Sequence, residues 1–265
     1  MIDYKDICSK IESAAREAGK FIKRESIGFD ISRTENKGLH DFVSYVDKES
    51  ERMLVEKLAI ILPEAGFLAE EGTSSKISSE YCWVIDPLDG TTNFVHGLHP
   101  YAISVALTKD NVPVVGVVHE VEGDETFTAW KGGGAWLNES RINVSSAKKV
   151  SASLVATGFP YNDFNRLEKY MSCLSYFCRA SHGIRRLGSA SVDLSYVACG
   201  RFEAFYEYSL QPWDVAAGAF ILQQSGGKVS DFSGGNNYIF GKELIATNSF
   251  IFEEFLDIVK KYLNK

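Results

Sequence analysis

The first part of the chain carries apolar side chains at helical spacing. Between residues 4 and 25 they recur every three or four positions and share one face, while the opposite face is charged. A helix that lies on a membrane surface would need a predominantly basic polar face, which this stretch lacks. The pattern therefore predicts an amphipathic helix packed on a core, with a buried face made of Ile7, Ile11, Ala14, Ala15, Ala18, Phe21 and Ile22.

A second helix is predicted over residues 41–62. It begins with polar residues, and Pro63 ends it because proline cannot continue a helix. Residues 26–40, between the two helices, are polar and contain glycine, which indicates a loop or a hairpin. The core-facing side of the second helix is made of Val46, Met53, Leu54, Leu58 and Ile61.

Short apolar runs separated by turn residues follow the helices, and those over residues 102–107, 114–118 and 125–130 predict an antiparallel meander. The first run covers residues 66–69, and the second covers residues 83–85 after a polar loop over residues 74–80. Gly132-Gly133-Gly134 is interpreted as a turn, because no lysine or helix start follows it as in a phosphate-binding loop. The later strands, divided by the turns Asp110-Asn111 and Gly123-Asp124, are expected over residues 102–107, 114–118, 125–130 and 135–137.

The second half of the chain mixes helices with strands. Ser189 can cap a helix that closes at Gly200. A helix pair, an antiparallel sheet and a mixed α/β half predict an α+β fold, a layered αβαβα sandwich. We divide it into residues 1–150, which carry most of the candidate metal ligands, and residues 151–265, which carry Asp214 and the remaining candidate site residues, within one compact unit. In the second half, strands are expected over residues 154–157 and 202–206, and helices over residues 166–178, 188–200, 214–224 and 250–263.

Composition narrows the class of protein. The chain has 265 residues, 45% of them hydrophobic, and a net charge of −7, which argues against direct binding of nucleic acid. No apolar run approaches the ~18 residues of a membrane span, and the N-terminus lacks a signal-peptide pattern. The five cysteines show no Cys-x-x-Cys pairing. We interpret them as reduced thiols and expect a cytoplasmic protein.

The most informative stretch runs from Trp83 to Phe94. An apolar run ends in Asp86, and Pro87 then removes a backbone donor, so the strand is expected to stop there. Asp86 and Asp89 would then lie on one tight turn, where two carboxylates repel one another unless a cation lies between them. Oxygen ligands favour a hard cation, Mg²⁺ before Zn²⁺. The alternative is an ordinary polar Asp-Gly turn.

The stretch Trp83-Val84-Ile85-Asp86-Pro87-Leu88-Asp89-Gly90-Thr91-Thr92-Asn93-Phe94 resembles the first signature of the inositol monophosphatase family. The members of this family are Mg²⁺-dependent, lithium-sensitive phosphomonoesterases, commonly homodimers. Trp213-Asp214-Val215-Ala216-Ala217-Gly218, followed by Gly226-Gly227, resembles the family's second signature. Both motifs stand in the family's order, and the likeness covers nearly the whole chain.

The resemblance implies a set of metal ligands. Glu70, Asp86 and the Leu88 carbonyl would hold one Mg²⁺, and Asp86, Asp89 and Asp214 a second. A third ion would be bound by Glu70 through water molecules. Taken alone, each acid is an ordinary surface or capping residue, and Asp214 suits a helix start by its charge. Metal ions in such sites neutralise phosphate oxygens and activate water.

The resemblance also implies the catalytic and substrate-binding residues. Glu70 and Thr91 would orient the attacking water, and Asp47 would support the Thr91 hydroxyl. The alternative interpretation of Asp47 is an acid that only stabilises the start of a helix. The substrate side would comprise backbone groups of Gly90 and Thr91, together with Asp89, the segment Gly188-Ser189-Ala190, and Glu207. The alternative interpretation of Glu207 is an acid exposed on the surface of a strand. Lys37 lies in a loop that approaches the metal site in relatives.

Other readings of the chemistry find less support. The histidines lack a zinc-binding spacing, and no Gly-x-Ser-x-Gly elbow is present. The predicted function is therefore hydrolysis of inositol monophosphate or a similar polyol phosphate. Thr92-Asn93-Phe94 resembles the inositol branch. Adenosine 3′,5′-bisphosphate, fructose 1,6-bisphosphate and histidinol phosphate remain alternative substrates. A different class of function also stays open. As in some bacterial relatives, the protein could be an interaction module of the transcription machinery that retains its catalytic residues.

Overall fold

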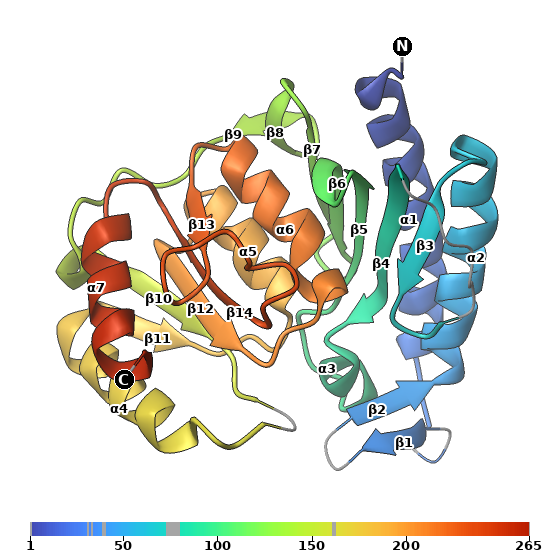
Figure 1. Cartoon of the computed structure of the whole chain (residues 1–265). Coiled ribbons are helices and arrows are strands. Elements are labelled where there is room, and N and C mark those ends of the chain that lie inside the picture. Colours follow the sequence, from blue (N-terminus) through green and yellow to red (C-terminus); the bar gives the residue numbers. More distant parts are fainter. Residues whose placement is uncertain are drawn as a thin grey trace.

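The computed structural model describes residues 2–264 except 31, 33, 39–40, 73–79 and 161–162, with the backbone alone described over residues 35–38 and 41–43. Its strands form a seven-stranded sheet, a five-stranded sheet and a separate hairpin of β1 (Thr34–Gly38) and β2 (Asp41–Ser44). Figure 1 shows the two larger sheets side by side, with helices outside and between them. The predicted loop over residues 74–80 lies outside the described residues except for Glu80.

The seven-stranded sheet contains the predicted meander. Its strand order is β3-β4-β5-β6-β7-β8-β9, and every neighbouring pair is antiparallel except β3 and β4, which run parallel. The sequence signals missed the last strand, which is three residues long. The bounds are β3 (Gly66–Ala69), β4 (Tyr81–Asp89), β5 (Ala102–Lys109), β6 (Val112–Glu120), β7 (Glu125–Trp130), β8 (Gly134–Leu137) and β9 (Ser140–Ile142).

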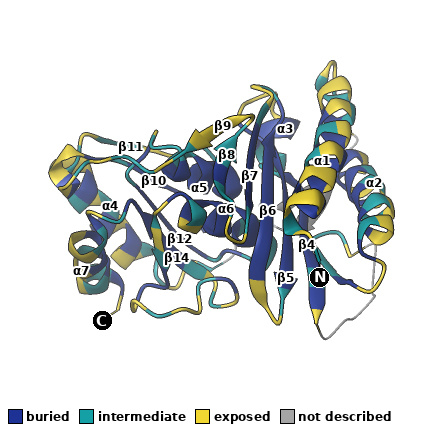
Figure 2. Cartoon of the chain, turned by 90° about the horizontal axis from the view of Figure 1, so that it is seen from above, coloured by how far each residue is buried: buried dark blue, intermediate teal, exposed yellow. Residues whose placement is uncertain are grey.

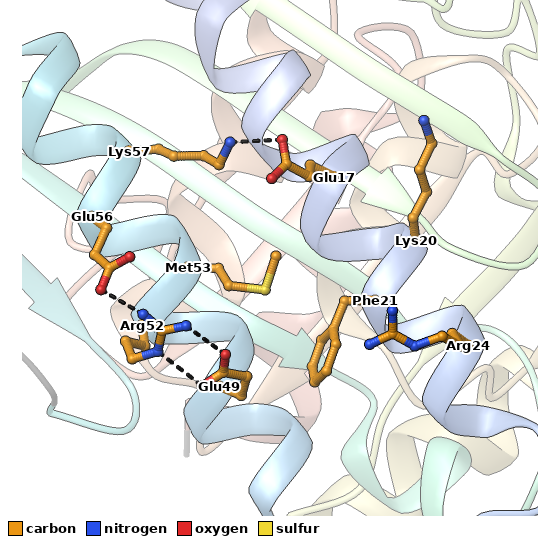
Figure 3. Close-up of a pocket in the computed structure, with 9 residues that line it drawn as sticks. All are labelled: Glu17, Lys20, Phe21, Arg24, Glu49, Arg52, Met53, Glu56 and Lys57. Carbon is orange, nitrogen blue, oxygen red and sulfur yellow. Dashed lines mark hydrogen bonds and ion pairs between the residues drawn. The ribbon is translucent and has the colours of Figure 1, made fainter.

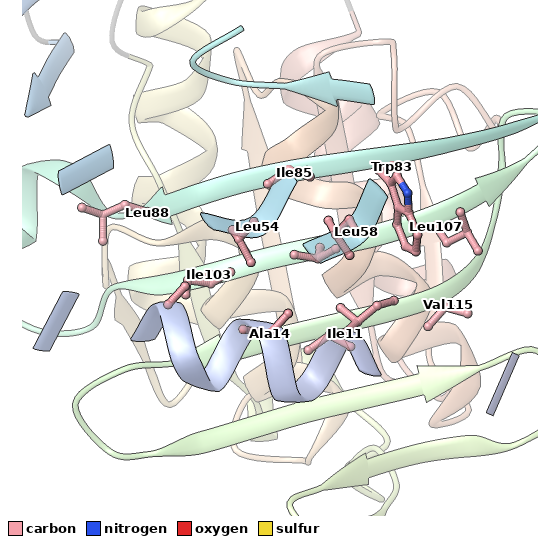
Figure 4. Packing of buried hydrophobic residues seen from close by; sticks show 14 of the residues in the cluster. Ile11, Ala14, Leu54, Leu58, Trp83, Ile85, Leu88, Ile103, Leu107 and Val115 are labelled. Carbon is pink, nitrogen blue, oxygen red and sulfur yellow. The ribbon is translucent and has the colours of Figure 1, made fainter. Parts of the chain in front are cut away.

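Two helices cover the outer face of this sheet. They are α1 (Tyr4–Ser26) and α2 (Tyr45–Ile61). Most of the predicted apolar face of each helix is buried, whereas Phe21, Met53 and Ile61 are only half-buried. Figure 4 shows this core, in which Ile11 of α1 and Leu54 of α2 pack toward Ile85 and Ile103 of the sheet. Burying a large aliphatic side chain contributes ~1.5–3 kcal/mol, so this layer anchors the strand that carries Asp86.

The five-stranded sheet has the order β11-β10-β12-β14-β13. β10 runs parallel to β11 and β12, whereas β14 runs antiparallel to β12 and β13. The sequence signals identified β10 and β12 but missed the other three, which are short or lie between turns. The bounds are β10 (Leu154–Thr157), β11 (Gly183–Arg185), β12 (Ala204–Tyr208), β13 (Lys228–Ser230) and β14 (Glu243–Thr247).

Helices α5 (Ala190–Ala198) and α6 (Pro212–Gln224) lie between the two sheets, and α4 (Leu167–Ala180) and α7 (Phe252–Leu263) cover the far face of the five-stranded sheet (Figure 1). Eight consecutive residues of α6 are buried, as expected for a helix enclosed on all sides. In Figure 2 the central strands and helices are largely dark blue, whereas the outer helices expose one face. The predicted layered αβαβα sandwich is confirmed.

Three local predictions were wrong. The helix expected from residue 41 begins at Tyr45, because Ser44 caps it and residues 41–44 pair as β2. β4 continues past Pro87 to Asp89, since the pairing with β5 shifts there and the missing proline N–H falls in a bulge. The Ser189 side chain makes no capping bond in α5, because its hydroxyl donates to Asp89 instead.

All five cysteines are free thiols. None of the described helices is both long and apolar enough to cross a membrane. The division of the chain at residue 150 stays a prediction. It falls where a short 3₁₀ turn, Val150–Ala152, leads from the first sheet into the second.

Candidate active site

The candidate site is built on the bulged end of β4. Asp86 pairs with Ser104 of β5 before the bulge, and Asp89 pairs with Ala102 after it. Asp86 is 2% exposed, and its Oδ1 accepts a hydrogen bond of 2.9 Å from the Leu88 N–H. Gly90 follows in the left-handed region with φ 97°, where a Cβ would lie 3.0 Å from the Pro100 carbonyl oxygen. The chain then enters the short helix α3 (Thr91–Val95).

Four carboxylates from three elements lie within electrostatic reach of one another. Burial raises the pKa of Asp86 well above its usual range, and the charges of Glu70, Asp89 and Asp214 raise it further. Glu70 comes directly after β3, and its N–H donates to the Ile85 carbonyl of β4. The four acids expected from the sequence are therefore brought near one another around the C-terminal end of β4.

Asp214 reaches this place from the start of α6. The Ser104 hydroxyl of β5 donates to the Trp213 carbonyl over 3.0 Å, which joins the helix start to the strand beside Asp86. The Oδ2 atom of Asp214 accepts the Gln211 N–H over 2.6 Å and forms a capping box. The helix-start interpretation of Asp214 is thus correct, and it coexists with the position near Asp86.

Among the described residues, no three Asp, Glu, His or Cys side chains enclose a point tightly enough to hold an ion. Coulomb repulsion acts over several ångströms, whereas Mg²⁺–oxygen bonds are ~2.0–2.1 Å long. The four carboxylates are therefore close enough to repel one another without converging on a single point. In three of them, Asp86, Asp89 and Asp214, one oxygen accepts a hydrogen bond from a backbone N–H. The donor set, four buried or half-buried carboxylates, fits a hard divalent cation.

The Thr91 hydroxyl lies between two acceptors. It is 3.0 Å from Oδ1 of Asp47 and 2.9 Å from the Leu88 carbonyl oxygen. Asp47 is 1% exposed, and its Oδ2 accepts the N–H of Ser44 over 2.8 Å and the Ser44 hydroxyl over 2.7 Å. Burial raises the pKa of Asp47, against the lowering effect of these hydrogen bonds. Asp47 therefore both completes the capping box of α2 and contacts Thr91.

Asp89 connects the two halves of the chain. Its Oδ2 accepts the Ser189 hydroxyl over 2.7 Å, the Ser191 N–H over 2.7 Å and the Ser191 hydroxyl over 2.5 Å. Asn93 adds a second link, because its amide donates to the carbonyls of Pro100 and Leu187. The segment from Gly188 to Ala190 thus lies beside Asp89, as the resemblance implies. Sequence reasoning missed Ser191, which lies 102 residues from its partner.

Glu207 is a buried residue of β12, 8% exposed, so the alternative of an exposed strand acid was wrong. Burial raises the pKa of Glu207 to about 8, the Arg186 guanidinium lowers it, and the charge of Asp89 raises it. The carboxyl group lies against Gly158, where a Cβ would come 2.0 Å from it. Glycine at position 158 therefore makes room for the Glu207 side chain.

Some sequence candidates lie elsewhere. The side chain of Lys37 falls outside the described residues. His119 is buried, and its Nδ1 is 2.9 Å from the Thr126 hydroxyl, which fits a structural role. A groove of about 580 Å³ lies between α1 and α2, where Lys57 pairs with Glu17, and Arg52 pairs with Glu49 and Glu56 (Figure 3). None of the candidate site residues lines this groove.

Comparison with known proteins identifies the family. The model of the inositol monophosphatase family matches residues 3–264. The chain is 42% identical over 251 residues to a putative Nus factor SuhB of Neisseria meningitidis serogroup B, covering 94% of this chain and 96% of that protein. It is 38% identical over 249 residues to the inositol-1-monophosphatase of Rhizobium meliloti, covering 94% of each.

Solved structures give the same result. The extragenic suppressor protein suhB of Bartonella henselae superimposes with a TM-score of 0.90 at 36% identity, over 97% of this chain and 99% of that one. The inositol monophosphatase of Anabaena superimposes with a TM-score of 0.86 at 32% identity, over 97% and 96%. Since the family model and these relatives span nearly the whole chain, the protein belongs to the inositol monophosphatase family.

Proposed function

We propose that this protein is a Mg²⁺-dependent phosphomonoesterase that hydrolyses inositol monophosphate or a similar polyol phosphate. Family membership implies a phosphatase. One observation carries the proposal further. Four carboxylates gather around Asp86, and the Thr91 hydroxyl beside them contacts both Asp47 and the Leu88 carbonyl. Acids that repel one another in a buried place suit a cationic cofactor and an anionic substrate.

Two or three Mg²⁺ ions would be held by Glu70, Asp86, the Leu88 carbonyl, Asp89 and Asp214. When bound, such ions neutralise phosphate oxygens, lower the pKa of water and stabilise the leaving alkoxide. Asp86 is suited to serve two ions, because its carboxylate is the one on which the charges of the other three acids act.

Thr91 and Glu70 would orient the attacking water. The Thr91 hydroxyl has one proton and two acceptors, Asp47 Oδ1 and the Leu88 carbonyl, so its lone pairs remain available to accept a hydrogen bond from water. Asp47 holds the hydroxyl in this orientation and is itself fixed by Ser44. A group positioned to receive a proton contributes ~10²–10⁴-fold in rate.

The substrate side supports a hydroxyl-bearing alcohol. Glu207 and Asp89 present buried carboxyl groups near the start of α5, with Gly188, Ser189 and Ala190 beside them. Backbone groups of Gly90 and Thr91 would bind the phosphate. The Bartonella and Anabaena structures share this fold, and so does SaIMPase-II, whose crystal structure contains bound inositol monophosphate. That ligand supports a polyol phosphate here.

A panel of phosphate esters with Mg²⁺ tests the substrate class. We expect the highest kcat/KM with inositol monophosphate, compared with adenosine 3′,5′-bisphosphate, fructose 1,6-bisphosphate and histidinol phosphate. A clear preference for one of the last three would contradict the polyol assignment. Equal absence of turnover on every ester would contradict the phosphatase itself.

Glu207→Ala tests the alcohol side directly. The loss of a hydrogen bond to a charged group costs ~1.5–3 kcal/mol, which is roughly tenfold to a hundredfold in kcat/KM for inositol monophosphate. A flat aryl phosphate offers no hydroxyl groups, so its kcat/KM should barely change and serves as the control. An unchanged ratio of the two kcat/KM values would remove Glu207 from the substrate site.

A second candidate function follows from the names of relatives. Several proteins at 37–42% identity, among them those of Neisseria meningitidis and Haemophilus influenzae, are called Nus factor or putative Nus factor. The chain would then also contact the transcription machinery, through protein rather than nucleic acid because of its net charge of −7. A pull-down with the Asp86→Asn variant should still capture transcription proteins. Loss of capture with this variant would tie any such contact to the intact catalytic site.

The remaining expectations are part of the same proposal. The protein would act in the cytoplasm as a homodimer, as relatives commonly do. Sedimentation equilibrium measures the mass directly, and a mass of about 29.4 kDa at micromolar concentration would contradict the dimer.

A further inference from the structure

Asn93 is a buried residue of the short helix α3, 7% exposed, whose side chain joins segments from both halves of the chain. Its Nδ2 atom donates to the Pro100 carbonyl over 2.7 Å and to the Leu187 carbonyl over 2.8 Å. Both hydrogens of the amide are therefore used. The first bond reaches seven residues along the chain and the second reaches 94. A turn after α3 accounts for the first bond only.

The second hydrogen bond holds the start of the proposed alcohol-binding segment, because Leu187 directly precedes Gly188-Ser189-Ala190. Gly188 has a φ of 92°, and a Cβ at this position would lie 3.1 Å from both the Nδ2 and the Oδ1 atoms of Asn93. Such a separation is tighter than ordinary van der Waals contact. Glycine at position 188 thus allows the Asn93 amide to approach the segment closely.

The same two backbone stretches lie against the proposed phosphate-binding turn. A Cβ at Gly90 would come 3.0 Å from the Pro100 carbonyl oxygen and 3.3 Å from the Gly188 carbonyl oxygen. Gly90 is therefore packed on the stretches that Asn93 ties together. Both acceptors of the Asn93 amide are carbonyls outside the proposed set of metal ligands, so this link needs no bound ion.

We propose that Asn93 is a positioning residue that fixes the spacing between the phosphate side and the alcohol side of the site. Inositol monophosphate must reach both sides, and a misplacement of about 1 Å can cost about a hundredfold in rate. An aryl phosphate without hydroxyl groups uses the phosphate side alone. Asn93 thereby sets how strongly the site prefers a polyol phosphate. The inference rests on the proposed function, because it takes Gly188-Ser189-Ala190 as the alcohol side.

Two substitutions remove the donors of Asn93. Asn93→Asp keeps the shape and replaces the NH₂ group with an oxygen, whereas Asn93→Ala removes the amide without adding a charge. The measured quantity is the ratio of kcat/KM for inositol monophosphate to that for 4-nitrophenyl phosphate. We expect both variants to lower this ratio by about tenfold. Mg²⁺ affinity in calorimetric titration and the inhibition constant of inorganic phosphate should stay within about twofold of wild type, because neither depends on the alcohol side.

Asn248→Asp is the matched control. The Asn248 amide is 0% exposed and also donates two hydrogen bonds between distant segments, to the Ser145 hydroxyl over 2.9 Å and to the Ala147 carbonyl over 3.0 Å. It comes directly after β14, at the end of the strand opposite to the one that pairs with Glu207. This variant should lose stability in urea unfolding, as Asn93→Asp does, but keep the wild-type ratio of kcat/KM values.

Hydrogen exchange followed by mass spectrometry provides a readout that does not depend on activity. Peptides that cover residues 187–191 should exchange faster in both Asn93 variants than in wild type and should keep the wild-type rate in Asn248→Asp. The proposal is overturned if Asn93→Ala keeps the wild-type ratio, if Asn248→Asp lowers the ratio as much as Asn93→Asp does, or if exchange over residues 187–191 is unchanged in both Asn93 variants.

The two levels of proposal fail in different ways. A wild-type protein that hydrolyses neither ester would contradict the proposed function, while hydrogen exchange would still report whether Asn93 holds the segment from Leu187 onward. A wild-type preference for inositol monophosphate that survives both Asn93 substitutions would contradict the role of Asn93 alone.

Discussion

Asp47 contacts two different groups with its two oxygens, which allows its structural role and its proposed catalytic role to be tested separately. Oδ2 accepts two hydrogen bonds from Ser44 at the start of α2, and Oδ1 accepts the Thr91 hydroxyl. In Asp47→Asn the amide oxygen can still accept the hydrogen bond from the Ser44 N–H only if the amide NH₂ group faces Thr91. Because an NH₂ group cannot accept, the Thr91 hydroxyl must then donate to the Leu88 carbonyl, 2.9 Å away.

In Asp47→Asn, the rotation of the Thr91 hydroxyl away from residue 47 should change kcat more than it changes the free energy of unfolding. A correctly positioned proton acceptor contributes ~10²–10⁴-fold, so we expect Asp47→Asn to lower kcat by about a hundredfold, at the low end of that range. Since the cap survives in this variant, the free energy of unfolding should fall by less than ~1 kcal/mol. Steady-state kinetics with saturating Mg²⁺ and urea unfolding measure the two effects.

Ser44→Ala is the matched control. It removes the hydroxyl that caps the Val46 N–H and also contacts Asp47, but it leaves the Ser44 N–H bound to Asp47. We expect a loss of ~0.5–2 kcal/mol in stability, with kcat close to wild type. The reasoning is refuted if Ser44→Ala lowers kcat as much as Asp47→Asn does, or if Asp47→Asn keeps full kcat.

The other predictions concern metal, ligand roles and pH. Excess EDTA should abolish hydrolysis, Mg²⁺ should restore it and lithium should inhibit it; full activity in EDTA would rule out the metal model. Asp86→Asn should weaken Mg²⁺ binding in calorimetric titration and abolish activity, whereas Thr91→Ala should lower kcat and leave Mg²⁺ affinity largely intact; equal losses of affinity would contradict this division. The pKa of Glu207 is raised to about 8, so the folded state holds a proton that the unfolded state has lost above its ordinary pKa. Stability should therefore fall as pH rises from about 5 to 8, by up to ~1.4 kcal/mol per pH unit, and this component should be absent in Glu207→Gln. Urea unfolding of both proteins without metal, from pH 5 to pH 9, measures the difference, and parallel curves would argue against a protonated Glu207.

Local patterns in the sequence were sufficient for the elements that have one clear periodicity. The apolar face of α1 and the meander from β4 to β7 follow from side chains that repeat every 3.6 or 2 residues. The apolar run before Asp86 was also recognised as a strand, although the strand itself continues to Asp89. The short strands β9, β11 and β13 have only three residues each, too few for a period to emerge.

Pro87 illustrates the limit of local rules. Taken alone, a proline ends a strand, because it cannot donate to the ladder. In the folded protein β5 pairs on either side of a bulge, so the missing N–H has no partner to lose and the strand continues to Asp89. This extension turns Asp89 toward α5 rather than leaving both acids on one simple turn.

The sequence by itself, through its resemblance to the family, predicted which residues would carry the chemistry, namely the acids at strand and helix ends and the threonine beside them. Only the tertiary structure decided which partners they have. Asp89 meets Ser191 across 102 positions, and Glu207 becomes a buried acid because β12 is covered by α5. Periodicity specifies that a face is buried but not which surface covers it. Hydrogen bonds and charges between distant segments therefore exist only after the layers have packed.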